Sequence, residues 1–196
     1  MDTSDENQLI ALQKSFTYLC KEAKVFEKGN EINNINLDKL WINTKTKEKY
    51  AEIVEEYIRL LAQNSGKIED IVIVTPDTIS QNYGATPIVF LVAEKLGCKV
   101  AIWQEMGDFV NRRSWLIGDI KPRKKCIIVQ DVVRSGITVL KIMRSFQKLE
   151  WQLIKYAALV LYCQDPKKLE ATEKEYKAFT GVNLPLEYLI TDNKLH

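Results

Sequence analysis

The most informative stretch of the sequence is KKCIIVQDVVRSGITVLKIM, residues 124–143. Its apolar run at 126–130 does not alternate with polar residues, which predicts a β-strand that is buried on both faces, as in a parallel sheet. The strand is followed by one carboxylate, Asp131, and by a turn made of Ser135, Gly136 and Thr138. A helical pattern then runs over about 139–149. The stretch therefore predicts a strand-turn-helix unit with polar groups at the junction.

The same pattern recurs on both sides of this unit. Short apolar runs alternate with helical segments, which is typical of an α/β fold whose mostly parallel sheet is covered by helices on both faces. The predicted strands are 71–74, 98–103, 126–130, 156–163 and 186–191, and the predicted helices are about 86–96, 139–149 and 166–179. We therefore expect a doubly wound sheet.

The N-terminal part differs from this pattern. Apolar residues at spacings of three and four predict a helix over 5–24, and a second helix over 50–61 is ended by Ser65 and Gly66. Between them, NEINNINLDKLWINT (30–44) alternates apolar and polar residues and is interpreted as an irregular strand. No linker or repeat interrupts the chain. We expect a single domain over 1–196, with N-terminal elements in 1–44 and an α/β core in 45–196.

Composition excludes several classes of protein. The net charge is +2 and the pI is near 8.2, so nucleic acid is not an expected partner, and the basic residues 112–113 and 121–125 are interpreted as solvated turns. His196 is the single histidine, which makes a histidine base or a histidine-ligated metal improbable. The four cysteines show no zinc spacing, and no apolar run approaches the ~18 residues of a membrane span. A reduced, cytoplasmic protein with no membrane contact is expected.

Ligands of open parallel sheets bind beyond the carboxyl ends of the strands, where the 131–138 junction lies. Backbone N–H groups and hydroxyls at a helix N-terminus suit a phosphate, while the acceptor-only carboxylate of Asp131 suits ribose hydroxyls or a hydrated metal ion. The sequence SGIT alone is more typical of a capped loop without a ligand. Together with the strand and Asp131, it favours a sugar phosphate.

The segment CIIVQDVVRSGIT (126–138) resembles the phosphoribosyl-pyrophosphate binding motif of type I phosphoribosyltransferases. That motif has an apolar strand, two acidic residues, two apolar residues and a Thr/Ser-Gly-x-Thr/Ser loop. The likeness extends from about Leu12 to Leu195 and is greatest to orotate phosphoribosyltransferases, in the segments 24–29, 36–44, 116–133, 158–165 and 186–191. The resemblance implies the type I fold, with residues 1–44 forming a hood.

The resemblance also implies roles for individual residues. Asp131, with Gln130 beside it, would bind the ribose hydroxyls. The residues around the 5-phosphate would be Arg134, Ser135, Gly136, Ile137 and Thr138. TPDTISQNYGATPI (75–88) stands where the family has a glycine-rich pyrophosphate loop, which would place Thr75, Asp77 and Gly84 on the pyrophosphate side. Magnesium is the implied cofactor, without a direct protein ligand.

The sequence departs from the family on the pyrophosphate side. Gln130 replaces the first acidic residue of the motif. Orotate phosphoribosyltransferases carry an Arg-Lys pair and then a mobile cationic loop in this region. The corresponding positions in this sequence are occupied by Trp103, Gln104, Gly107 and Phe109. Loss of one electrostatic donor can cost ~10²–10³ in rate. Arg112 and Arg113 are candidate substitutes that would act in catalysis, and a solvated pair is the alternative.

The tryptophans give a weaker signal. Trp103 follows a predicted strand at the edge where ligands bind, so it is the candidate for stacking on a base. Burial in a core or an interface is the alternative for this residue and for Trp41, Trp115 and Trp151.

Three functions remain open at this stage. The first is transfer of ribose-5-phosphate from phosphoribosyl pyrophosphate to a nitrogenous base. The second is a catalytically weakened module that binds a nucleoside monophosphate or phosphoribosyl pyrophosphate in a regulatory role. The third and weakest is an RNA-binding regulator, which would rest on the basic turns. The resemblance implies a homodimer, and the sequence does not identify the base.

Overall fold

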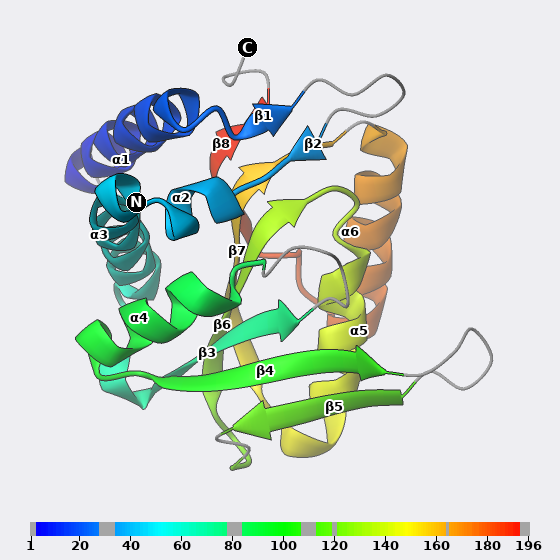
Figure 1. Cartoon of the computed structure of the whole chain (residues 1–196). Coiled ribbons are helices and arrows are strands. Elements are labelled where there is room, and N and C mark those ends of the chain that lie inside the picture. The colour runs from blue at the N-terminus through cyan, green and yellow to red at the C-terminus, as the bar shows by residue number, and fades with distance from the viewer. Residues whose placement is uncertain are drawn as a thin grey trace.

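The computed structural model describes residues 3–27, 34–77, 84–106, 113–118, 121–163 and 165–192 (Figure 1). The helices are α1 (Thr3–Glu22), α2 (Asp38–Ile42), α3 (Thr44–Ala62), α4 (Thr86–Leu96), α5 (Ile137–Phe146) and α6 (Pro166–Thr180), with 3-10 turns η1 (Ile68–Asp70) and η2 (Gln147–Leu149). The strands are β1 (Phe26–Glu27), β2 (Asn34–Ile35), β3 (Ile71–Asp77), β4 (Lys99–Met106), β5 (Arg113–Gly118), β6 (Lys125–Val133), β7 (Gln152–Leu161) and β8 (Leu186–Thr191).

The main sheet has the strand order β5-β4-β3-β6-β7-β8. Every neighbouring pair is parallel except β4 and β5, which are antiparallel. From β3 the chain moves to β4 on one side, and it then returns to place β6 on the other side of β3. The carboxyl ends of β3 and β6 therefore form the point at which the winding direction reverses, which is where ligands of such sheets bind.

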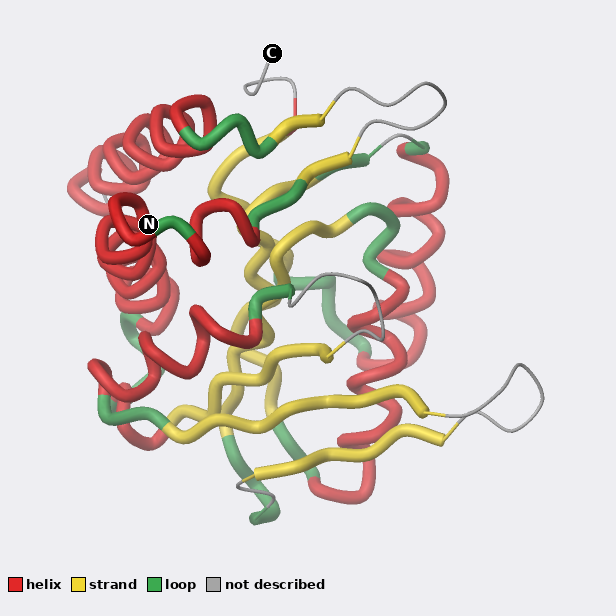
Figure 2. The backbone as a smooth tube through the Cα atoms, viewed as in Figure 1, coloured by secondary structure: helices red, strands yellow, loops and turns green. Residues whose placement is uncertain are grey.

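Two hydrophobic cores cover the two faces of this sheet, because successive side chains of a strand point in opposite directions. Ile73 and Ile127 belong to the core that includes buried residues of α1, α3 and α4. Val74 and Ile128 belong to the other core, together with α5 and Tyr176 of α6. Figures 1 and 2 show the two groups of helices on opposite sides of the sheet. The predicted doubly wound architecture is confirmed.

The segment between α1 and α3 differs from the sequence-based prediction. In the described residues 34–44 of the segment expected to be an irregular strand, the chain forms the two residues of β2 and then turns into α2. The side chain of Asn36 accepts a hydrogen bond from the N–H of Asp38 (3.1 Å), and the hydroxyl of Thr46 donates to the carbonyl of Leu40 (2.9 Å). These local bonds stabilise a helical turn that the alternation of apolar residues did not reveal.

A further difference is β5, since the sequence analysis predicts no strand over residues 113–118. Gly118 ends this edge strand with a φ of +122°, and a Cβ atom there would lie 2.3 Å from the carbonyl oxygen of Val100. Glycine therefore allows β5 to lie close against β4. In addition, α3 begins at Thr44, several residues before the expected start, because Asn43 caps it by accepting from the N–H of Lys45 (3.0 Å).

The four thiols are free, and burial raises the pKa of Cys98 to about 11 and that of Cys126 to about 12. Burial thus keeps these two thiols protonated near neutral pH. Among the helices of the described residues, none combines the length and the hydrophobicity that crossing a bilayer requires.

Candidate functional site

Asp131 lies near the carboxyl end of β6, where its side chain is half-buried. Burial raises the pKa of this carboxyl, and the negative charge of Asp38 raises it further. The backbone N–H groups of Val132 and Asp131 itself and the charge of Arg134 act in the opposite direction. A carboxylate in this position has lost part of its hydration, so it gains more than an exposed one from donors on a ligand.

The turn after β6 leads into the N-terminus of α5. Gly136 precedes the helix with a φ of +73°, and a Cβ atom there would lie 3.3 Å from side-chain atoms of both Leu169 and Thr172. The hydroxyl of Thr172 donates to the carbonyl of Ser135 (2.7 Å), so α6 holds the turn in place. No side chain caps α5, which leaves the N–H groups of its first turn for an anion.

The other residues predicted for the phosphate surround this turn. Ile137 is 43% exposed and Thr138 is half-buried at the first positions of α5. Arg134 is exposed, and its guanidinium carbon lies 5.5 Å from the centroid of the Tyr162 ring. Stacking on this ring holds a cation beside the phosphate turn.

Gly84 brings the β3–α4 connection to the end of β6. A Cβ atom built on this glycine would lie 3.9 Å from Oδ2 of Asp131, and its φ of +62° is a conformation that glycine adopts readily. The predicted pyrophosphate side and the predicted ribose side of the site therefore lie next to each other. Within this connection, residues 78–83 lie outside the described part of the chain.

Two threonines border the same connection. The hydroxyl oxygens of Thr75, at the end of β3, and Thr86, the first residue of α4, are buried and have no hydrogen-bond partner within the described residues. A buried hydroxyl without a partner costs about 1–3 kcal/mol, so each can gain from a ligand or water. Sequence reasoning named Thr75 and missed Thr86, although Thr86 follows Gly84 at a helix start. Asp77 accepts a hydrogen bond from the amide of Gln104 (2.7 Å).

Gln130 is held by its own neighbours. Its amide oxygen accepts from the hydroxyl of Tyr156 (2.6 Å), and its amide nitrogen donates to the carbonyl of Val132 (3.1 Å). Tyr156 is fully buried, and burial followed by the charge of Asp131 raises its pKa. These contacts fix the Gln130 amide against the protein interior, one residue before the carboxylate.

Trp103 is 2% exposed and belongs to the core beneath α5. Its indole nitrogen donates to the hydroxyl of Ser145 (3.1 Å). This corrects the expectation that Trp103 stacks on a base, because the side chain of this strand residue points into the α5 side of the sheet. Arg112, Gly107 and Phe109 lie outside the described residues, as does the side chain of Arg113, whose backbone begins β5.

Sequence reasoning also missed Asp38 and Tyr50, which come from the N-terminal elements. Asp38 is the first residue of α2 and is 9% exposed, and Tyr50 of α3 is 2% exposed. Burial raises the pKa of Tyr50, followed by the charges of Asp131, Cys20 and Asp38. The one signal in the sequence is an acidic residue between Leu37 and Leu40, in a segment that alternates apolar and polar residues.

The described residues fit a magnesium ion only together with the phosphates of a bound substrate. Within the described ranges, no group of three or more His, Cys, Asp or Glu side chains could hold a metal. Magnesium in nucleotide sites is typically held by one or two carboxylates together with substrate phosphates, and Asp131 fits that role. The bound ion would neutralise phosphate charge.

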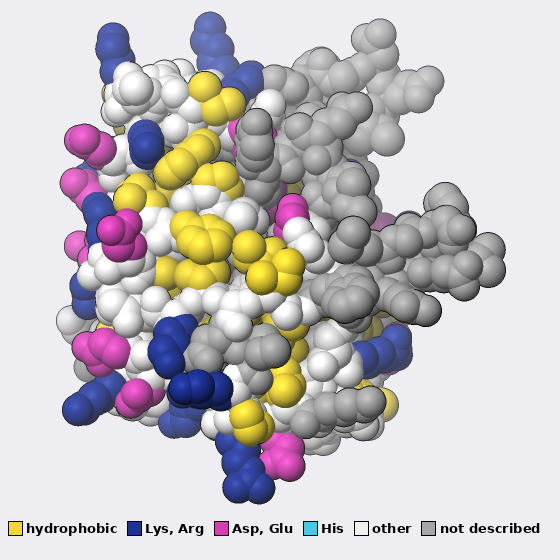
Figure 3. Space-filling view, turned by 60° about the horizontal axis from the view of Figure 1, so that its bottom comes forward, with side chains coloured by type: hydrophobic (Ala, Val, Ile, Leu, Met, Phe, Trp, Pro, Cys, Tyr) yellow, Lys and Arg dark blue, Asp and Glu magenta, His cyan; other side chains and the backbone are white. Residues whose placement is uncertain are grey.

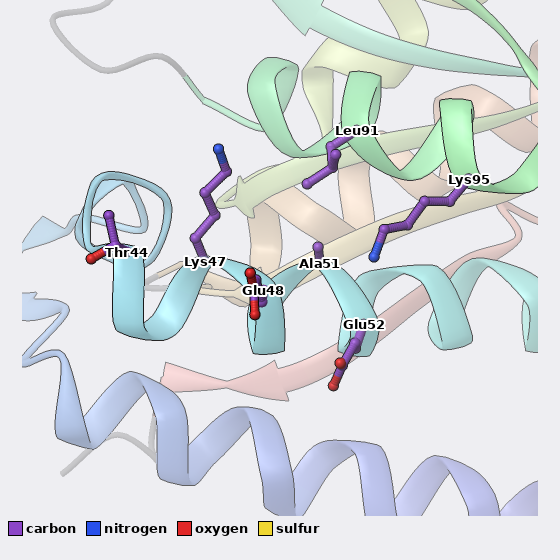
Figure 4. A pocket seen from close by; sticks show the side chains of 7 residues that line it. All are labelled: Thr44, Lys47, Glu48, Ala51, Glu52, Leu91 and Lys95. Atoms are coloured by element: carbon purple, nitrogen blue, oxygen red, sulfur yellow. The ribbon is translucent and has the colours of Figure 1, made fainter.

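Two surface grooves lie away from these residues. The larger, about 590 Å³, runs between α3 and α4 (Figure 4). It is lined by Thr44, Lys47, Glu48, Ala51, Glu52, Leu91 and Lys95. The smaller, about 260 Å³, lies between α1 and α3. Mixed charges line the larger groove, and neither groove contains a predicted site residue. The residues around Asp131 and the start of α5 therefore remain the candidate site.

Comparisons with known proteins agree with this geometry. A family model described as phosphoribosyl transferase domain matches residues 45–189. No curated protein matches the sequence.

Solved structures similar to the chain include orotate phosphoribosyltransferase from Aeropyrum pernix, with 14% identity, a TM-score of 0.66, and coverage of 91% of this chain and 94% of that one. The orotate enzyme of Mycobacterium tuberculosis with inorganic phosphate has 12% identity, a TM-score of 0.63, and coverage of 92% and 90%. Adenine phosphoribosyltransferase from Trypanosoma brucei, in complex with AMP, pyrophosphate and ribose-5-phosphate, has 12% identity, a TM-score of 0.62, and coverage of 94% and 81%. At these identities the likeness establishes the fold alone.

Proposed function

The chain belongs to the phosphoribosyl transferase domain family, and on that premise we propose that it transfers ribose-5-phosphate from phosphoribosyl pyrophosphate to a nitrogenous base. One observation supports the proposal most directly. The Asp131 carboxylate lies beside Gly84 at the switch point of the sheet, and the turn that follows its strand leads into the uncapped N-terminus of α5. A carboxylate for ribose hydroxyls and a helix N-terminus for the 5-phosphate are the two contacts that such a substrate needs.

In this proposal, the phosphate turn anchors the substrate. The backbone N–H groups from Ser135 to Thr138 bind the 5-phosphate, and Arg134 adds a positive charge at its edge. Asp131 accepts from the ribose hydroxyls. As the bond between C1 and the pyrophosphate oxygen breaks and the bond to the base nitrogen forms, positive charge develops on the ribose, and the nearby carboxylate stabilises it.

The leaving group would lie on the side of the β3–α4 connection. The partnerless hydroxyls of Thr75 and Thr86 are suited to donate to pyrophosphate oxygens, and Gly84 permits close approach of the backbone. Arg112 and Arg113 are proposed to cover the departing pyrophosphate, and magnesium accompanies the substrate. The carboxylate of Asp77 is proposed to act through Gln104, which it holds at 2.7 Å.

A second candidate is a catalytically weakened module that binds a nucleotide or phosphoribosyl pyrophosphate in a regulatory role. The contacts of Gln130 favour it, because its amide is turned to Tyr156 and Val132 and brings no second negative charge to a magnesium-bound sugar. The burial of Trp103 favours it as well, because a family cation position is occupied by a core residue.

We also propose a cytoplasmic homodimer. Figure 3 shows hydrophobic side chains gathered near the middle of the view, with charged side chains mainly along its left and lower edges. Phe90 of α4 is 48% exposed and Ile117 of β5 is 51% exposed. An apolar centre with a polar rim is typical of an interface.

A transfer assay tests the primary function. The protein is incubated with phosphoribosyl pyrophosphate, Mg²⁺ and each of adenine, guanine, hypoxanthine, uracil and orotate, and phosphorus NMR follows nucleotide and pyrophosphate. We expect one base to be converted, and Asp131→Asn to reduce the rate by at least ~10². If no base is converted while ribose-5-phosphate still binds, the proposed transferase activity is wrong, and the second candidate function, a regulatory binding module, is supported instead.

A further inference from the structure

A path of hydrogen bonds connects the interior of the sheet to the segment that carries Asp131. The hydroxyl of Tyr156 on β7 donates to the amide oxygen of Gln130 on β6 (2.6 Å), and the amide nitrogen of Gln130 donates to the carbonyl of Val132 (3.1 Å). Asp131 lies between the two residues that this amide joins, and its carboxylate accepts from the N–H of Val132. The path therefore encloses the residue that carries the carboxylate.

Tyr156 is a rigid starting point for this path. Its side chain is fully buried and packs in the core that α5 covers. Its strand pairs in parallel with β6, with Tyr156 opposite Ile128 and Ala158 opposite Gln130 (Figure 1). Because the close-packed core fixes the ring and the strand pairing fixes the backbone, the hydroxyl oxygen has a defined place beside the Gln130 amide.

Glutamine suits this path better than an acidic residue would. Its amide accepts from Tyr156 with the oxygen and donates to Val132 with the nitrogen, whereas an ionised carboxylate can only accept. A glutamate at position 130 would remove the donor to the Val132 carbonyl and would add a negative charge beside Asp131. Gln130 therefore supplies a link to the neighbour of Asp131 rather than a second charge.

Resting on the proposed function, we infer that Tyr156 and Gln130 are positioning residues: they hold the Asp131 carboxylate in the orientation that accepts from the ribose hydroxyls. Paired hydroxyls on one ring require the carboxylate oxygens to lie at defined places, and a displacement of about 1 Å can cost ~10²-fold in activity. Gln130, which the resemblance places beside Asp131 at the ribose hydroxyls, acts through Asp131 in this assignment, as Tyr156 does.

Tyr156→Phe removes the hydroxyl and keeps the buried ring. Titrations followed by phosphorus NMR compare ribose-5-phosphate, which uses both Asp131 and the phosphate turn, with inorganic phosphate, which uses the turn alone. The variant should bind ribose-5-phosphate at least ~5-fold more weakly and inorganic phosphate within about twofold of the wild type. Tyr57→Phe is the matched control, because the Tyr57 hydroxyl is buried without a hydrogen-bond partner within the described residues, and it should leave both affinities unchanged.

A second comparison separates positioning from a general effect on the fold. In the Asp131→Asn background, Tyr156→Phe should weaken ribose-5-phosphate binding by no more than about twofold, because the charge that Tyr156 positions is already absent. Gln130→Met removes both amide bonds at a half-buried position with a side chain of similar length, and it should repeat the result of Tyr156→Phe. The test therefore does not depend on the folding of one variant.

Three results would overturn the inference. The first is an unchanged affinity for ribose-5-phosphate in Tyr156→Phe and Gln130→Met. The second is an equal loss for ribose-5-phosphate and inorganic phosphate, and the third is an additive effect of Tyr156→Phe and Asp131→Asn. In each case the wild type still binds ribose-5-phosphate, so the proposed function stands. If the wild type binds neither compound, the proposed function fails and the inference falls with it.

Discussion

Gly84 and Asp131 meet at the centre of the site: a Cβ atom on the glycine would lie 3.9 Å from Oδ2 of the aspartate. Gly84 lies in the connection between β3 and α4, and Asp131 lies near the carboxyl end of β6. The contact therefore joins this connection to β6 at the switch point of the sheet. Because a Cβ atom at position 84 would already be in van der Waals contact with the carboxylate, a larger side chain there would occupy space beside Asp131.

Substitution at this position tests that relationship. Gly84→Val should weaken binding of ribose-5-phosphate at least ~10-fold, because the branched side chain extends toward Asp131. It should also destabilise the fold by about 1–2 kcal/mol, the cost of a left-handed backbone conformation for a residue with a Cβ. Gly181→Val is the matched control, since Gly181 has a φ of +79° and nothing within 4 Å of a built Cβ. Equal ribose-5-phosphate affinities in the two variants, measured by calorimetry, would show that Gly84 is not at the site.

Asp131→Asn should bind ribose-5-phosphate at least ~10-fold more weakly, because a hydrogen bond to a charged group contributes about 1.5–3 kcal/mol. It should also change the dependence of stability on pH. The pKa of Asp131 is raised in the folded protein, so this carboxyl favours folding below its ordinary pKa of about 4, and that contribution is lost as the pH rises through the folded pKa.

The asparagine variant cannot ionise and should therefore melt at a higher temperature than the wild type at pH 7. The difference should approach zero near pH 4. Melting curves across this range check the prediction, with Asp70→Asn as the exposed control. A variant that is less stable than the wild type at pH 7 would contradict the conclusion that burial raises the pKa of Asp131.

The hydroxyl of Thr172 holds the phosphate turn through the carbonyl of Ser135. Thr172→Val keeps the shape of the side chain and removes this bond, so it should cost about 1 kcal/mol of stability and weaken ribose-5-phosphate binding several-fold. Thr180→Val removes another hydroxyl of α6, which donates to the carbonyl of Tyr176 (2.8 Å) far from the turn. Thermal melts and titration of both variants should show similar stabilities and a defect in binding for Thr172→Val alone.

Phe90 is central to the proposed dimer. Phe90→Glu places a charge on the apolar face of α4, so size-exclusion chromatography with light scattering should show a monomer where the wild type is a dimer. Tyr18→Glu changes an aromatic residue of α1 that is 71% exposed, and it should leave the dimer intact. A wild type that is monomeric at high protein concentration would refute the proposed dimer.

Local features of the chain made much of this structure predictable. The strands β3 and β6 are continuous apolar runs, and the turn before α5 carries its carboxylate, its glycine and its hydroxyls within a few residues. Each of these follows from short-range preferences that a sequence displays directly. The doubly wound sheet and the Asp131 junction are therefore predictable from the sequence.

Features that depend on distant contacts were not predictable in this way. The effect of the Asp38 charge on the pKa of Asp131 depends on how α2 packs on α3, and no spacing in the sequence encodes it. The burial of Trp103 depends on which face of β4 meets α5, and a tryptophan at a strand end is compatible with either face. The edge strand β5 was missed because its pairing partner, β4, determines its conformation.

The most direct test of the central claim is calorimetric titration of the protein with phosphoribosyl pyrophosphate and with ribose-5-phosphate, with and without Mg²⁺, repeated with Asp131→Asn. The account predicts that both compounds bind, that phosphoribosyl pyrophosphate binds more tightly and only in the presence of Mg²⁺, and that the variant loses at least ~10-fold for both. Failure of both compounds to bind the wild-type protein would contradict the account.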